Sequence, residues 1–331
     1  MEEPTFTDYV TLIFNLFDRF VQANPTWESQ RFTYTQREMM VFFMLMQQRQ
    51  IHAFKAQRRW LMAHVTERRQ LGWDRVPDRT TLSRRYKALY AVLQAFVAFV
   101  GQDAEALDER FESRDLYEDK SLFKAKGPVW HQSDRQTGRI PEKLRHLDTD
   151  ATWSKSGYHG WVYGYGMHLT DNGAGFPKLV QIETAAYSEA QAMQDKEQVI
   201  LYVLQPDTLC GDNGYTAARR IRQWAAHGVG LLTPAFKWVK GRYAQAYHAF
   251  IQLPDNALLL RARRTAIEPV FDLIAKLIGA VDNHKQLPLQ RLENVRTCLA
   301  LATLSLQVAM IINSIWALPL RSISYFQGAF T

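Results

Sequence analysis

Apolar side chains in the first third of the chain recur at the spacing of amphipathic helices. Between residues 6 and 21 the apolar positions lie three or four residues apart and would share one face: Tyr9, Ile13, Leu16, Phe17 and Phe20. Thr35 followed by Glu38 has the spacing of a capping box, and it precedes an apolar run over residues 39–46. This pattern predicts an all-α region that extends to about residue 119.

The pattern changes at residue 146, where short apolar runs alternate with turn residues and helical stretches. Strands are predicted over residues 146–153, 160–169, 179–184, 199–204 and 229–232, and helices over residues 188–196 and 216–226. This order of elements predicts an α/β fold. Residues 114–145 are polar and interrupted by Gly and Pro, so we interpret them as irregular. The predicted organisation is a helical region (1–119), a linker (120–145) and an α/β domain (146–331).

One uncharged segment, residues 298–320, is long enough to cross a bilayer as a helix that rises about 1.5 Å per residue. The same segment contains Thr303, Gln307 and Asn313, and Pro319 falls near its end. We therefore predict a buried helix that packs on the sheet, and no association with a membrane.

The composition is that of a folded protein with an excess of positive charge. Among 331 residues, 47% are hydrophobic and 22% are charged, which excludes a disordered chain. The formal net charge of +7 favours a polyanionic partner such as nucleic acid. Cys210 and Cys298 match no metal or redox spacing, and the acidic first residues lack the basic start of a signal peptide. A cytoplasmic location is therefore expected.

Three acidic positions stand in contexts that suit a divalent metal ion. Asp212 lies in a turn between a predicted strand and a predicted helix, and glycines on both sides allow the chain to turn sharply. Asp150 lies on a predicted strand, where Asp148 shares its face and is the alternative ligand. Glu268 lies on a predicted helix that we expect to begin near Pro269, where a negative charge is favoured.

The segments around these acids resemble the signatures of the DDE transposases of bacterial insertion sequences. They are Asp150-Ala-Thr152, Gly211-Asp212-Asn-Gly-Tyr215 and Arg264-Thr-Ala-Ile-Glu268-Pro-Val-Phe271. The resemblance covers roughly residues 147–313. It implies a ribonuclease H-like domain, a mixed sheet flanked by helices, in which Asp150, Asp212 and Glu268 hold Mg²⁺, with Mn²⁺ as a substitute.

Phosphoryl transfer on DNA suits a site built from carboxylates. Two Mg²⁺ ions about 4 Å apart activate the attacking oxygen and neutralise the leaving group. Because Mg²⁺ prefers oxygen ligands and keeps several waters, a few carboxylates suffice to hold it. The resemblance further implies that Arg264 holds a DNA phosphate, and that the protein acts as a homodimer or larger assembly on DNA.

Residues 76–89 resemble the second half of a helix-turn-helix, in which Asp78 or Thr80 would cap the helix. The side chains left to face DNA are Arg79, Ser83, Arg84 and Lys87. A basic stretch over residues 47–69 adds Arg58 and Arg59, and residues 155, 159 and 237–242 are further candidates for DNA contact. These features predict an N-terminal DNA-binding region.

The resemblance and the basic helix together predict a transposase that binds the terminal inverted repeats of its element on the bacterial nucleoid. It would cleave double-stranded DNA at the transposon end and join the freed end to target DNA. Two alternatives use the same residues: a standalone metal-dependent nuclease on the same fold, and a noncatalytic DNA-binding protein derived from a transposase.

Overall fold

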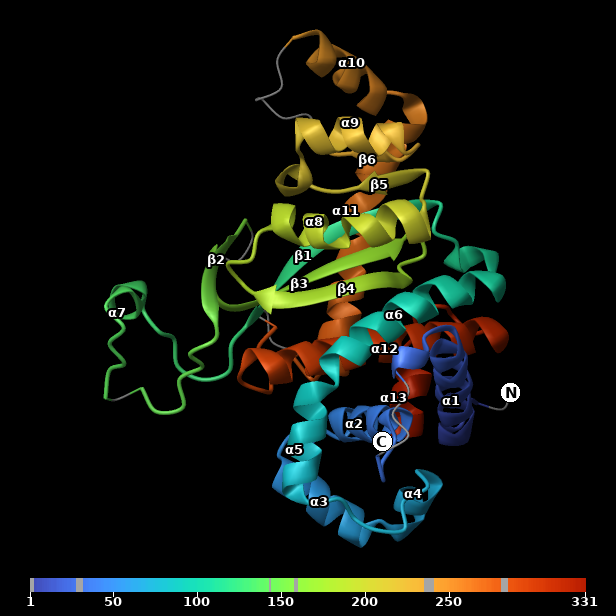
Figure 1. Ribbon diagram of the computed structural model, residues 1–331, viewed down its shortest axis with the longest axis vertical. Helices are drawn as coiled ribbons and strands as arrows, with labels where there is room; N and C mark the ends of the chain where they lie inside the picture. The colour runs from blue at the N-terminus through green and yellow to red at the C-terminus, as the bar shows by residue number, and fades with distance from the viewer. Residues whose placement is uncertain (1–2, 28–31, 143, 158–159, 235–240, 281–284) are drawn as a thin grey trace.

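The computed structural model describes residues 3–27, 32–142, 144–157, 160–234, 241–280 and 285–331. Residue 159 and most of the basic stretch 237–242, both candidates for DNA contact, lie outside these residues. The chain forms a mixed α/β structure in which a curled sheet is flanked by helices, and the N-terminal helices gather beneath it in Figure 1.

The N-terminal region is helical, as predicted. Its helices are α1 (Phe6–Ala23), α2 (Gln36–Gln48), α3 (Phe54–Ala63), α4 (Val65–Gln70), α5 (Arg79–Ala88) and α6 (Tyr90–Asp103). The predicted capping box is present: the Thr35 hydroxyl accepts from the backbone N–H of Glu38, whose carboxylate accepts from the Thr35 N–H. Asp78 caps α5 by accepting from the N–H of Thr81 at 2.8 Å.

The described strands form one sheet around β1. They are β1 (Asp115–Lys124), β2 (Thr152–Ser156), β3 (Gly160–Asn172), β4 (Pro177–Thr184), β5 (Thr208–Cys210) and β6 (Gly230–Leu232). On one side of β1, β3 is antiparallel to it, and β2 and β4 pair with successive stretches of β3. On the other side β5 is parallel to β1, and β6 is parallel to β5.

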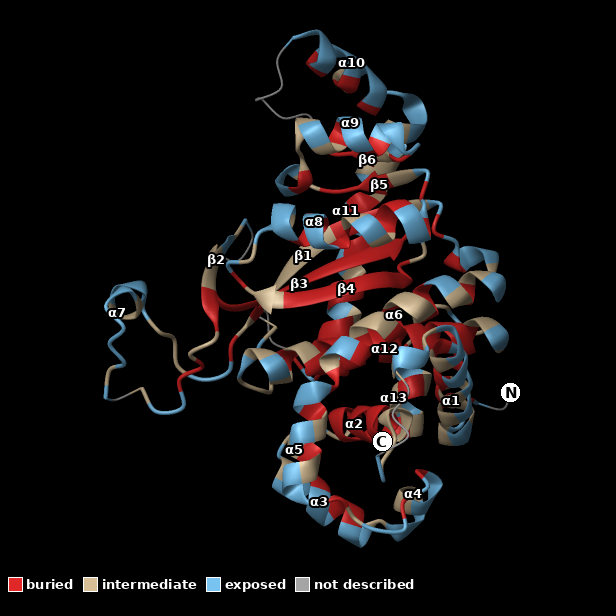
Figure 2. Cartoon of the chain, viewed as in Figure 1, coloured by how far each residue is buried: buried red, intermediate tan, exposed pale blue. Residues whose placement is uncertain are grey.

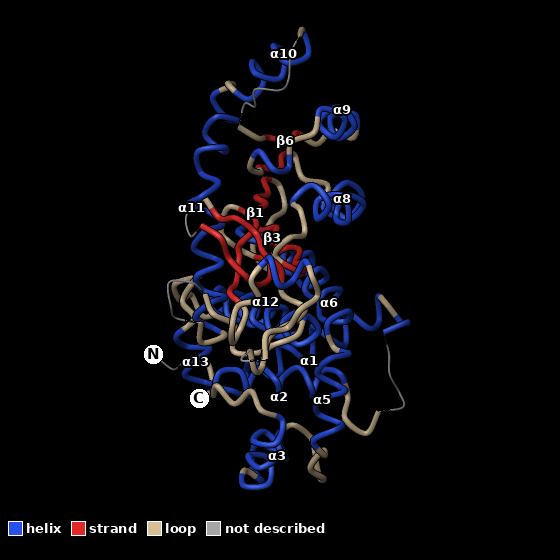
Figure 3. Tube along the Cα trace, turned by 90° about the vertical axis from the view of Figure 1, so that its left-hand side faces the viewer, coloured by secondary structure: helices blue, strands red, loops and turns tan. Residues whose placement is uncertain are grey.

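Helices cover both faces of this sheet. The helices that follow the strand β4 are α8 (Glu189–Val199), α9 (Ala218–Ala226), α10 (Arg242–Ile251), α11 (Pro254–Leu277), α12 (Leu292–Ile315) and α13 (Ser324–Phe330). Helices α6, α11 and α12 pack on strands of the sheet, whereas α13 packs against α1, α2 and α12. Seen edge-on in Figure 3, the sheet separates α11 on one side from α8 and α9 on the other. A short helix, α7 (Gln132–Gln136), lies in the long connection between β1 and β2, which projects from the body in Figure 1.

The long apolar helix predicted near the C-terminus is α12, and it forms the centre of the core. By length and composition it could cross a membrane, but 89% of its most apolar stretch is buried inside the protein. It packs against α6 and β4 and also against α1, α2 and α5, so it joins the sheet to the N-terminal helices (Figure 2). The amide nitrogen of its Gln307 finds partners: it donates to the carbonyls of Val97 and Pro177 at 2.9 and 2.8 Å. The prediction of a buried helix packed on the sheet is confirmed.

The structure corrects the predicted boundaries around β1. Residues 115–124, predicted to end a helical region and begin an irregular linker, are the central strand of the sheet. The predicted boundary at residue 119 therefore falls inside a strand. The pattern is misleading because β1 turns charged side chains inward on both of its faces, where Lys196 pairs with Glu118 and Arg263 pairs with Asp119.

Two other predicted strands are wrong. Residues 146–151 form turns, and strand β2 begins only at Thr152. Residues 200–204, predicted as a strand, continue α8 as a π-helical turn that ends at Gln205 in the left-handed region, with φ 46°. The turn buries Ile200, Leu201 and Leu204, whose spacing of one and three residues suits a helix and not an alternating strand.

Candidate active site

Asp119, on β1, and Asp212, just beyond the end of β5, follow the parallel pairing of these two strands. In the pairing of β1 with β5, Tyr117 is opposite Cys210, and each acid follows two residues later. Adjacent strands lie about 4.8 Å apart, so the register brings two acids far apart in sequence into one neighbourhood. Burial raises the pKa of Asp119, the charge of Arg263 opposes that rise, and the negative charge of Asp212 adds to it.

The turn that carries Asp212 has the form expected from its sequence. The Asp212 carboxylate accepts from the backbone N–H of Gly214 at 2.7 Å and so caps a short 3₁₀ turn, Asn213–Tyr215. The ring of Tyr215 is fully buried beneath this turn and lies against Gly211. The turn therefore presents Asp212 at the end of β5 on a backbone held by packing.

A third carboxylate, Glu189, reaches the same turn from the start of α8. Ser188 caps this helix by accepting from the N–H of Gln191, which sets Glu189 at its first position. A β-carbon added at Gly214 would lie only 1.5 Å from Oε2 of Glu189, so the glycine is what allows the close approach. Burial and the charge of Asp212 raise the pKa of Glu189 to about 7, although the charge of Lys120 opposes the shift. The sequence signal near this acid is the capping pattern around Ser188, and none of the acidic motifs includes Glu189.

Lys120, next to Asp119 on β1, supplies a cation on the α8 side of the sheet. Its ammonium donates to the carbonyls of Ala185 and Tyr187 at 2.8 and 2.7 Å. Burial lowers its pKa, whereas the charges of Glu189 and Asp212 raise it. A β-carbon at Gly166 would meet Cε of Lys120 at 2.8 Å, so the lysine crosses β3 where the strand has no side chain.

The raised pKa of Glu189 predicts how the free energy of unfolding of the metal-free protein depends on pH. Because its pKa rises from 4.5 to about 7 on folding, the native state keeps a proton that the unfolded state has released. Stability should therefore fall as the pH rises through that window, and Glu189→Gln should reduce this fall. Urea unfolding at a series of pH values measures the effect, and equal slopes for the two proteins would contradict it.

Glu268, the third acid predicted from the sequence, lies on α11 on the opposite face of the sheet from α8. Its carboxylate is 3.8 Å from the guanidinium of Arg264, and both side chains are largely exposed. Five residues before it, Arg263 binds Asp119, and four residues after it, Asp272 pairs with Lys285 at 2.9 Å. Glu268 therefore lies on an exposed side of α11, in the part of the helix that packs against β1, and not among the buried residues of that helix.

The predicted start of the helix near Pro269 is wrong. Helix α11 begins at Pro254 and runs to Leu277, and Pro269 lies inside it. Pro254 takes the favoured first-turn position instead. Glu268 is therefore in a helix interior, where the attraction of a helix N-terminus for negative charge does not account for it.

Asp148 and Asp150 are not brought to Asp212 by a strand; they cap α12. The Asp148 carboxylate accepts from the N–H of Arg291 at 3.1 Å and from the Tyr165 hydroxyl at 2.8 Å. The Asp150 carboxylate accepts from the N–H of Leu292 at 3.0 Å. These bonds satisfy backbone donors that the first turn of a helix leaves free.

This placement predicts a loss of stability when the cap is removed. We expect Asp150→Ala to lower the free energy of unfolding by about 1 kcal/mol, the usual worth of a helix cap. Replacement of the exposed Asp74 by Ala is a matched control and should change it by less than about 0.5 kcal/mol. Urea denaturation measures both, and equal stability of the two variants would rule out a capping role for Asp150.

Apart from Arg264, the residues predicted to bind DNA lie on α5 and α3. On α5, Arg79, Arg84 and Lys87 are exposed and Ser83 is half-buried, while Leu82 and Tyr86 face the core. An open hollow of about 450 Å³ runs along this face, lined by Thr80, Ser83, Arg84, Lys87, Ala88 and Glu293. Arg58 and Arg59 are exposed on α3, which packs against α5.

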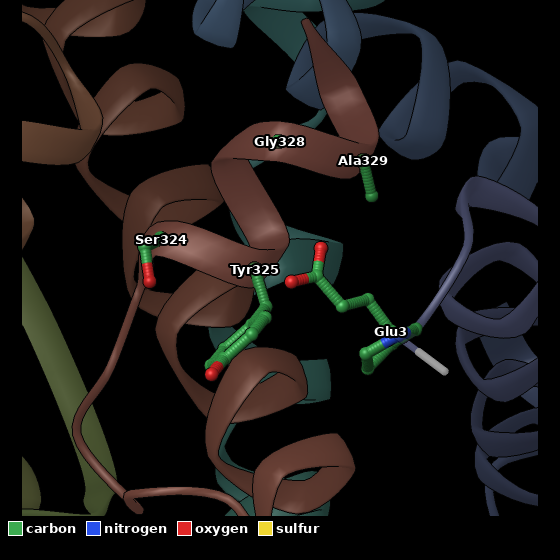
Figure 4. A pocket seen from close by; sticks show the side chains of 6 residues that line it. Glu3, Ser324, Tyr325, Gly328 and Ala329 are labelled. Carbon is green, nitrogen blue, oxygen red and sulfur yellow. The ribbon is translucent and has the colours of Figure 1, made fainter. Parts of the chain in front are cut away.

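The carboxylates near Asp119 have the chemistry that Mg²⁺ requires, but they are not assembled around a common point. In the described part of the chain, no group of three or more His, Cys, Asp or Glu side chains is arranged to hold a metal ion. A separate pocket of about 320 Å³ lies between Glu3, Pro4 and α13 (Figure 4), away from the strands that carry the acids. Comparison with models of protein families, with curated proteins and with solved structures found no match to this chain.

Proposed function

We propose that this protein is a metal-dependent enzyme of DNA phosphodiester chemistry, a transposase of the DDE class. The observation that carries the proposal is the parallel pairing of β1 with β5, which ends at Tyr117 and Cys210. It brings Asp119 and Asp212, each two residues further on, near enough that the charge of Asp212 raises the pKa of Asp119. Leaving β2 aside, the strand order β4-β3-β1-β5-β6, with only β3 antiparallel to its neighbours β1 and β4, supports a ribonuclease H-like domain. We take the first acid of the site to be the one on the central strand, because that strand pairs in parallel with the strand before the Asp212 turn.

The central strand carries Asp119, so we assign the first acidic position to Asp119 in place of Asp150. The second position stays with Asp212. For the third there are two candidates, Glu189 on α8 and Glu268 on α11. Oxygen ligands of this kind suit Mg²⁺ or Mn²⁺.

In the proposed reaction these side chains would hold Mg²⁺, which supplies the activation of an oxygen nucleophile and the neutralisation of charge on the phosphate. The protein itself would fix the positions of the metal ligands and of the bound DNA. Buried Tyr215 packs beneath the turn of Asp212, and strand β1 fixes the backbone of Asp119. Arg264, exposed and 3.8 Å from Glu268, would hold a phosphate of the bound strand.

The basic face of α5 would bind DNA, and its contribution to DNA affinity can be measured separately from cleavage. We expect Arg84→Ala to weaken binding of duplex DNA and to reduce by about one the slope of log affinity against log salt concentration, because one phosphate contact is lost. Exchange of Arg114, exposed beside β1 and paired with Asp207, for Ala is the matched control and should leave the slope unchanged. Equal slopes for Arg84→Ala and the unmodified protein would remove α5 from the interface.

The test of the proposed function is divalent-metal-dependent cleavage and joining of short duplexes taken from the ends of the encoding element. Cleavage and joining that Asp212→Ala abolishes would support the transposase, and the effect of Glu268→Ala against Glu189→Ala would identify the third acid. Cleavage without joining would favour a standalone nuclease. The ion pair that occupies Asp119 favours a second candidate, a noncatalytic DNA-binding protein, and tight binding without chemistry would establish it.

A further inference from the structure

Arg263 places a positive charge directly on the carboxylate of Asp119. Its Nη1 donates to Oδ2 of Asp119 at 2.8 Å, and the two side chains are only 11% and 17% exposed. The neighbouring Arg264 is 76% exposed and lies 3.8 Å from Glu268. Two consecutive arginines on α11 thus have opposite placements, one turned into the sheet and one turned to solvent.

A guanidinium in this position competes with a divalent cation. Both need the negative charge of Asp119, and like charges a few ångströms apart repel strongly at a site that is mostly withdrawn from water. The described carboxylates are not arranged around a common point, which agrees with an Asp119 side chain engaged by another partner. The structure therefore has a cation at the first acidic position, and this cation belongs to the chain itself.

We propose that Arg263 is a built-in counter-ion, which keeps Asp119 from binding a divalent metal until a DNA phosphate draws the guanidinium away. The inference rests on the proposed function and adds a form of regulation to it. A phosphate accepts two parallel hydrogen bonds from a guanidinium, and Asp119 accepts one here, so phosphate is a suitable competing partner. Arg264, one residue further on, would bring the DNA backbone to this part of α11.

The consequence is that metal and DNA bind cooperatively, each raising the affinity for the other by the same factor. Mn²⁺ binding to the full chain, followed by the electron paramagnetic resonance signal of free Mn²⁺, measures this without any catalytic step. Without DNA, Arg263→Gln should bind Mn²⁺ at least about tenfold more tightly than the unmodified protein, because a neighbouring charge shifts ion affinity at a carboxylate by at least that much. A short duplex of arbitrary sequence should tighten Mn²⁺ binding to the unmodified protein but not to Arg263→Gln.

Two controls accompany this measurement. Arg296→Gln breaks another partly buried ion pair, with Glu183 on β4, and should leave Mn²⁺ affinity unchanged. Asp119→Asn with the same duplex gives the amount of Mn²⁺ that the DNA itself holds. These controls separate an effect of Arg263 at the site from a general effect of losing an arginine.

Equal or weaker Mn²⁺ binding by a folded Arg263→Gln would overturn the inference and make the pair purely structural. If that variant does not fold, the test is the Mn²⁺ affinity of the unmodified protein with and without the duplex. An affinity that is the same in both cases would also overturn the inference. Mn²⁺ binding that depends on Asp119 but not on Arg263 would leave the proposed function standing. No Mn²⁺ binding to any variant, with or without DNA, would contradict both.

Discussion

Replacement of Asp119 by Asn is expected to reduce Mg²⁺-dependent DNA cleavage by about a thousandfold or more. The substitution keeps the size of the side chain and removes a negative charge in the neighbourhood of Asp212. A metal ligand contributes several kcal/mol to the stabilisation of the transition state, and each 1.36 kcal/mol is a factor of about ten in rate. Single-turnover cleavage of a transposon-end duplex is the measurement.

The same experiment on Asp150→Asn distinguishes the structural assignment from the one implied by the sequence motif. Asp150 accepts from the N–H of Leu292 at the start of α12, and an asparagine oxygen can accept in the same way. We therefore expect Asp150→Asn to retain activity within about tenfold, because its fold and its metal ligands are intact. If Asp150→Asn were inactive and Asp119→Asn active, Asp150 would be the metal ligand, as the sequence motif implies, and Asp119 would not.

The largest loss of stability is expected from Lys196→Met. The ammonium of Lys196, on α8, pairs with the fully buried carboxylate of Glu118, which also accepts from the Thr170 hydroxyl. Removal of one partner leaves a buried charge without compensation, which costs about 3–5 kcal/mol in known cases. Urea unfolding near neutral pH measures the free energy of unfolding.

Two further results would identify the cause of that loss. The double variant Glu118→Leu with Lys196→Met should recover most of the stability, because two apolar side chains of similar size can replace a buried pair. Burial already raises the pKa of Glu118, and without Lys196 to oppose it the pKa should rise further. The single variant should thus lose stability as the pH rises, because its folded state keeps a proton that the unfolded state releases. A double variant no more stable than Lys196→Met would mean that packing, not charge, is the reason.

The elements read from local patterns were largely predictable. The spacing of Tyr9, Ile13 and Phe20 on α1 and the caps at Thr35 and Asp78 depend on neighbours a few residues away, and each is present in the structure. Strands β3 and β4 and the Asp212 turn also match their signals. The buried placement of α12 followed from its polar side chains, which need partners inside a protein.

The central strand was not predictable in this way. A pattern of hydrophobic positions identifies a strand by its apolar side chains, whereas β1 carries Glu118, Asp119 and Lys120 in its middle. These charges are tolerated only because Lys196, Arg263 and two backbone carbonyls meet them from distant parts of the chain. The residues next to β1 in the sequence do not indicate that these distant partners exist.

The sequence by itself thus determined the helical N-terminal region with its exposed basic helix, the capping residues, the buried apolar helix and the acidic turn at Asp212. Only the tertiary structure decided which acids are neighbours. It set Asp119 beside Asp212, brought Glu189 to Gly214 and gave Asp148 and Asp150 to the start of α12. The reason is physical: capping and periodicity act over a few residues, but the pairing of two strands and the docking of a helix fix distances between residues that lie far apart in the sequence.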